Sequence, residues 1–67
     1  MQKVLSLVTE GNFGARAEII ESSSGYKVDY YDNRGLFLKS DLVALNNLQE
    51  CERVVQKNLE NIQYLEG

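Results

Sequence analysis

The stretch DYYDNRGLFLK, residues 29–39, holds the clearest turn signal of the chain and sets the pairing of two strands. Asp32 suits the first position of a type I turn, and Gly35 supplies the left-handed residue that closes a hairpin loop. This loop pairs Asp32 with Leu36. The aromatic and basic residues in the stretch also raise a functional question, because such residues can stack on nucleic-acid bases or simply form an ordinary hairpin.

The register of this hairpin follows by counting outward from the turn. One side of the hairpin then carries an aromatic pair and an opposite-charge pair across the two strands. Favourable cross-strand pairs of this kind are worth ~0.2–1 kcal/mol each. The predicted pairs are Tyr31 with Phe37 and Asp29 with Lys39 on one face, and Tyr30 with Leu38 and Val28 with Ser40 on the other.

Apolar and polar residues alternate through the first 40 residues, which is typical of strands with one buried face. Glycine-bearing segments interrupt the alternation and indicate turns, namely EGNFG at 10–14 and SSSG at 22–25. The segment DLVALN, residues 41–46, is expected to be a connection. The predicted strands cover about residues 3–9, 15–21, 26–32 and 35–40.

The last third of the chain predicts an amphipathic helix over about residues 48–65. Asn47 is expected to cap it, with Glu50 as its partner in a capping box. Its apolar stripe comprises Leu48, Cys51, Val54, Val55, Leu59, Ile62 and Leu65. The sequence therefore predicts a single small α+β domain spanning 1–67, an antiparallel meander of three to four strands followed by one C-terminal helix packed on one sheet face.

One helix can cover only one face of the sheet, so the other face is expected to be open. The side chains predicted to meet the helix are Val4, Val8, Ala15, Ala17, Ile19, Val28, Tyr30, Leu36 and Leu38. Those predicted on the open face are Lys3, Leu5, Leu7, Arg16, Glu18, Ile20, Lys27, Asp29, Tyr31, Phe37 and Lys39.

A contiguous apolar patch on an open face usually marks an interaction site. The candidate interaction surface therefore consists of Leu5, Leu7, Ile20, Tyr31 and Phe37, with Arg34 at the exposed turn. The charges around it are of both signs, which suits a protein partner. The alternative is a curled sheet, or a different register, that buries some of these residues within the monomer.

Chain length favours self-association. A chain of 67 residues buries only ~60% of the surface that its unfolded form exposes. Domains of this size usually add a disulfide, a metal or oligomerisation. Cys51 is the single cysteine and there is no histidine, so an intrachain disulfide is excluded and a structural zinc site is disfavoured. We therefore expect a homodimer, the commonest closed oligomer.

The sequence predicts no enzyme and no catalytic residue. Cys51 lies on the apolar stripe without a histidine to activate it, and the serines of SSSG have no general base beside them. Neither glycine-bearing loop resembles a phosphate-binding loop, and the acidic residues do not converge on one face. We accordingly expect no cofactor, no metal and no small-molecule substrate.

The expected environment is the cytoplasm, with no membrane partner. The apolar run near the N-terminus is broken by Ser6 and is shorter than the ~7–15 apolar residues of a secretory signal. No segment approaches the ~20 apolar residues that span a bilayer.

Nucleic-acid binding is the main alternative function. The net charge is −3, and the 7 basic residues are scattered along the chain without forming a run. The segment KVDYYDNRG does not match the aromatic strand of an RNA-recognition sheet. Binding of protein by the open face is therefore the leading prediction, and the charge disfavours nucleic-acid binding by the same face.

Two segments, AEIIESSSGYKVDYYDNRG at 17–35 and NLQECERVVQKNLENI at 47–62, resemble small uncharacterised proteins of marine T4-like bacteriophages that infect cyanobacteria. The shared pattern is Gly-Tyr-x-apolar-x-Tyr-Tyr followed by Asp or Asn, and then a helix that opens with Ser or Asn before Leu-x-x-x-Glu. The matching residues are Tyr26, Tyr30, Tyr31, Asp32, Leu48 and Glu52, while Asn58 stands where those proteins often carry tryptophan. The resemblance implies a phage accessory protein expressed in the host cytoplasm, and it transfers no site residues. With it, the protein-binding prediction extends to a phage factor that acts on a host component.

Overall fold

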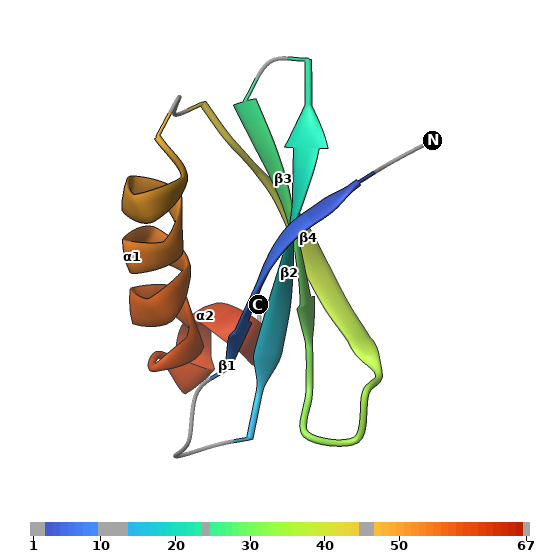
Figure 1. Cartoon of the computed structure of the whole chain (residues 1–67). Helices are drawn as coiled ribbons and strands as arrows, with labels where there is room; N and C mark the ends of the chain where they lie inside the picture. Colours follow the sequence, from blue (N-terminus) through green and yellow to red (C-terminus); the bar gives the residue numbers. More distant parts are fainter. Residues whose placement is uncertain (1–2, 10–13, 24, 45–46, 67) are drawn as a thin grey trace.

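The computed structural model describes residues 3–9, 14–23, 25–44 and 47–66 as a sheet with helices on one side (Figure 1). The strands are β1 (Val4–Thr9), β2 (Arg16–Ser22), β3 (Gly25–Tyr31) and β4 (Phe37–Val43), and the helices are α1 (Leu48–Leu59) and α2 (Ile62–Glu66). The strands form an antiparallel meander in the order β1-β2-β3-β4. The predicted α+β fold is confirmed. Residues 10–13 and 24 of the expected turns, and 45–46 of the expected connection, lie outside the described residues.

The turn between β3 and β4 forms as the sequence predicts. The backbone N–H of Asp32 donates to the Leu36 carbonyl at 2.9 Å, and that of Gly35 donates to the Asp32 carbonyl at 3.0 Å. Gly35 has φ +85°, a conformation that side-chain-bearing residues rarely adopt. The Asp32 carboxylate accepts from the backbone N–H groups of Leu36 and Arg34 at 2.9 and 2.8 Å. These donors, Leu36 foremost, hold the pKa of Asp32 below its usual value.

The register beyond the first pair differs from the prediction because β4 contains a bulge. Tyr31 pairs with Phe37 as expected, but the next pair is Tyr30 with Lys39, which leaves Leu38 as an extra residue. All later partners therefore shift by one. The predicted pairs of Tyr30 with Leu38, Val28 with Ser40 and Asp29 with Lys39 are wrong, and the observed ones are Tyr30 with Lys39, Asp29 with Ser40 and Val28 with Asp41.

Strand β4 also lies further along the chain than predicted, over Phe37–Val43 in place of 35–40. Part of the expected connection is thus a strand. Because of the shift, Lys39 lies on the covered face and Leu42 on the open face. Leu36 and Leu38, predicted to meet the helix, are exposed instead.

The predicted single helix over 48–65 is wrong in one respect, because it is broken after Leu59. The Asn47 side chain caps α1 as predicted, accepting from the N–H of Gln49 at 2.9 Å and of Glu50 at 3.4 Å. Asn61 does the same for α2, accepting from Gln63 and Tyr64 at 3.2 and 3.3 Å. A second cap inside the apolar stripe explains the break.

The core lies between the sheet and the helices. On the covered face Ala17, Ile19, Val28 and Tyr30 are fully buried, and they meet the equally buried Cys51, Val55 and Leu59 of the helix. Burial, and after it the negative charge of Glu52, raises the pKa of the Cys51 thiol.

Two tyrosines link the helices to the sheet. The Asn58 amide donates to the Tyr30 hydroxyl at 2.9 Å, and the Tyr64 hydroxyl donates to the Asp41 carboxylate. The two rings meet edge to face, with centroids 6.0 Å apart. Lys39 Nζ lies 3.8 Å from the Tyr64 ring centroid. Tyr64, on the helix that follows the break, thus contacts Lys39 and Asp41 of β4, and burial raises the pKa of both phenols.

Candidate interaction surface

The open face of the sheet, opposite the helices, is organised in three rows of side chains that run across the four strands. Strand pairing defines the rows, since directly paired residues share a face. The first row is Val4, Ile20, Lys27 and Leu42; the central row is Leu7, Glu18, Asp29 and Ser40; the third row is Thr9, Arg16, Tyr31 and Phe37.

Polar contacts hold the middle of the open face. The Ser40 hydroxyl donates to the Asp29 carboxylate at 2.8 Å, and Lys27 Nζ lies 3.8 Å from the same carboxylate oxygen. The Tyr31 hydroxyl lies 3.5 Å from the Glu18 carboxylate, to which it donates. Desolvation, followed by the Glu18 charge, raises the pKa of Tyr31. These polar groups satisfy one another within the monomer.

Large apolar side chains border the open face on both edge strands. Val4 and Leu7 on β1 are 49% and 64% exposed, and Phe37 and Leu42 on β4 are 58% and 75% exposed. The Phe37 ring packs edge to face against Tyr31, with centroids 5.9 Å apart. Apolar area is therefore concentrated at the rim, around a polar middle.

The structure places three of the predicted surface residues, Leu7, Tyr31 and Phe37, together on the open face. Ile20 lies on the same face but is only 4% exposed, so the expectation that it is displayed is wrong. It lies between Val4 and Lys27 in the first row. The alternative that some of these residues are buried within the monomer is therefore observed at Ile20.

Two further predicted residues lie beside the open face. Leu5 is half-buried at an irregularity of β1, where the pairing shifts between Val4 and Ser6. Arg34 is exposed in the β3–β4 turn, with its guanidinium 3.9 Å from the Asp32 carboxylate. The irregularity also moves Val4 to the open face, contrary to the prediction.

Sequence reasoning missed Val4 and Leu42 as members of the open face. Each lies beyond a bulge, where simple alternation assigns the wrong side. For Leu42 the sequence carries no signal of its place, because FLKSDLV does not alternate apolar with polar residues and only the observed burial along β4 alternates.

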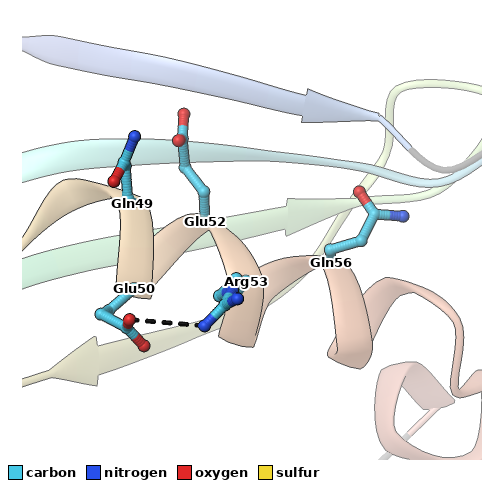
Figure 2. A pocket seen from close by; sticks show the side chains of 5 residues that line it. All are labelled: Gln49, Glu50, Glu52, Arg53 and Gln56. Atoms are coloured by element: carbon cyan, nitrogen blue, oxygen red, sulfur yellow. Dashed lines mark hydrogen bonds and ion pairs between the residues drawn. The ribbon is translucent and has the colours of Figure 1, made fainter.

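A shallow hollow of about 520 Å³ lies on α1, and all its lining residues belong to that helix (Figure 2). They are Gln49, Glu50, Glu52, Arg53 and Gln56, with Arg53 Nη1 3.5 Å from the Glu50 carboxylate. No nucleophile and base meet there. Within the described ranges, no three His, Cys, Asp or Glu side chains gather where they could hold a metal ion. In the same part of the chain, no helix is long and apolar enough to cross a membrane.

Comparison of the chain with protein-family models, with curated proteins and with solved structures finds no match. The resemblance to cyanophage proteins stays a prediction from the sequence.

Proposed function

We propose that this chain is a non-enzymatic protein-binding module that forms a homodimer through its open face. One observation carries the proposal: four large apolar side chains, 49–75% exposed, border a single sheet face that neither α1 nor α2 covers. Exposed apolar area of this kind is typical of interaction sites. Following the resemblance to phage proteins, we extend the proposal to a host protein as a further partner.

Charge balance favours a second copy as the occupant of the open face. Arg16 and Lys27 offset Glu18 and Asp29, so the face is neutral although the chain carries −3. Two copies facing each other across a two-fold axis therefore bring no excess of like charge together. A chain this small also gains more from added buried apolar area than a large one.

The same balance argues against nucleic acid as the ligand. Binding to phosphates requires an excess of basic side chains, and two acidic residues lie in the central row of the open face. Retention of DNA or RNA that falls steeply with salt would be the sign of the alternative function.

The proposal is tested by the oligomeric state of matched variants. Sedimentation velocity over a concentration series should show a dimer for the wild type. Leu42→Ser should raise the dissociation constant of the dimer about tenfold or more, because a buried leucine contributes more than 1.4 kcal/mol. Leu36→Ser is the control, because Leu36 is 57% exposed but lies at the turn, outside the three rows.

Two results would contradict the proposal. One is a wild-type chain that stays monomeric well above micromolar concentration. The other is an equal effect of Leu36→Ser and Leu42→Ser, which would place the contact elsewhere.

A further inference from the structure

Strand β1 forms an edge of the sheet and consists of uncharged residues. Its residues, VLSLVT, include no charge and no proline. Among the described strands it pairs with β2 alone. Natural proteins usually protect such edges with charged residues, prolines or bulges, because unpaired backbone groups accept another strand. Strand β1 has only the irregularity between Val4 and Ser6, whereas β4, at the other edge, has the bulge at Leu38 and also the charges of Lys39 and Asp41.

A row of α1 side chains lies beside this edge. Gln49, Glu52 and Gln56 recur at three and four residues along α1, and Figure 2 shows Gln49 and Glu52 rising from the helix on the side of β1. The Ser6 hydroxyl donates to the Glu52 carboxylate at 2.5 Å, which ties the row to the strand. An added strand would therefore run next to these three side chains.

Glu52 is the unbalanced charge in this row. Glu50, its acidic neighbour in the hollow, is matched by Arg53 at 3.5 Å. None of the ion pairs among the described residues includes Glu52. A carboxylate beside an open strand edge favours a cationic side chain on whatever binds there.

We propose that the edge of β1 binds an extended peptide segment of a partner protein as a fifth strand, with a lysine or arginine directed at Glu52. Backbone hydrogen bonds along the free edge would supply affinity, and the charge would select the partner, as in other cases of strand addition. The inference rests on the proposed protein-binding role but uses the edge of the sheet and not the open face.

The pleat of the sheet specifies the partner further. Side chains of an added strand alternate between the two faces. Those on the covered side meet Gln49, Glu52 and Gln56, while those on the other side extend the open face beside Leu7. The matching segment alternates polar or basic residues with apolar ones.

Two synthetic peptides of eight residues test the inference. Both alternate valine with threonine, and one central threonine is replaced by lysine in the first and by glutamate in the second. Fluorescence anisotropy should show the lysine peptide binding about two- to fivefold more tightly, the range of an ion pair of up to about 1 kcal/mol at a partly exposed site. Amide NMR shifts should concentrate on residues 4–9.

Two matched variants locate the charge. Glu52→Gln should abolish the preference for lysine, and its amide oxygen can still accept from Ser6. Glu50→Gln removes a charge from the same hollow but should leave the preference intact, because Glu50 is already paired with Arg53.

Several outcomes overturn the inference. They are equal binding of the two peptides, a preference for glutamate, no binding of either at millimolar concentration, an equal effect of the two variants, or shifts on β4. Pairing of β1 with a second copy, seen as β1 amide protection that is lost on dilution without peptide, would also overturn it. If the peptides fail to bind but dimer formation depends on Leu42, this inference is wrong and the proposed homodimer is still supported. The two proposals can therefore fail separately.

Discussion

The covered and open faces of the sheet come from the same alternating strands but have different surroundings. Ile19 and Val28 on the covered face are fully buried under α1, whereas Leu7 and Leu42 on the open face are largely exposed. Alternation assigns a residue to a face, but the covering layer decides whether that residue is buried. Matched substitutions on the two faces therefore measure what the helices contribute.

The largest expected difference comes from truncating one apolar side chain on each face. Ile19→Ala should lower the free energy of unfolding by about 2–5 kcal/mol, because it leaves a cavity in a packed core. Leu42→Ala should change the unfolding of the monomer by about 0.5 kcal/mol or less. Urea denaturation at a concentration below that of dimer formation measures both. Equal losses would mean that the open face is buried in the monomer.

Alkaline pH should destabilise the chain through Tyr30 and Tyr64, and Tyr31 on the open face adds to the effect because its pKa is also raised. The pKa values of Tyr30 and Tyr64 are raised by burial from the usual 10.0, so the folded chain holds these protons more strongly than the unfolded chain. Their stabilisation is fully present below pH about 10 and is lost as pH rises further, by up to about 1.4 kcal/mol per pH unit for each phenol. Denaturant titrations between pH 8 and 11.5 should show this decline.

Tyr64→Phe is the matched variant for the pH experiment. It removes one of the two phenols, so its stability should fall less steeply above pH 10 than that of the wild type. Cys51, whose pKa is also raised by burial, adds to the decline in both proteins. An identical pH profile for the two proteins would show that folding does not raise the pKa of Tyr64.

Removing single hydroxyl groups should give a smaller difference between the faces. Tyr30→Phe leaves the Asn58 amide without its acceptor at a part-buried site, which should cost about 1 kcal/mol. Tyr31→Phe breaks only a 3.5 Å contact with Glu18 on the open face and should cost less than about 0.5 kcal/mol. Thermal unfolding compares the two variants, and a larger effect at Tyr31 would reverse the assignment of the faces.

Local chemistry made much of the fold predictable. The Asp32–Gly35 turn, the Asn47 cap and the strand alternation each follow from a few neighbouring residues, and each is observed. The bulge at Leu38 was not predictable, because both registers pair Tyr31 with Phe37 and differ only in contacts made across the sheet. The second cap at Asn61 carried a local signal, an asparagine before an apolar residue, but the longer apolar stripe obscured it.

The sequence predicted that the open face carries apolar side chains, but it predicted only some of these residues correctly. Leu7, Tyr31 and Phe37 follow from parity alone, but Val4 and Leu42 reach the open face only because bulges shift the pairing. The burial of Ile20 depends on its neighbours in space, which no count along the chain supplies.

Deletion of Leu38 should have the smallest effect on stability. It tests most directly what assigns the residues after the bulge to one face of the sheet or the other. Leu38 is the residue that β4 carries in excess, so its removal lets Lys39 follow Phe37 directly and still oppose Tyr30. The pairs of Asp29 with Ser40 and Val28 with Asp41 should then persist, and Lys39 should stay over the Tyr64 ring. Cross-strand NOEs between β3 and β4 would establish this. New partners for Ser40 and Asp41 would show instead that the bulge, and not the contacts of Lys39, Ser40 and Asp41, selects the register.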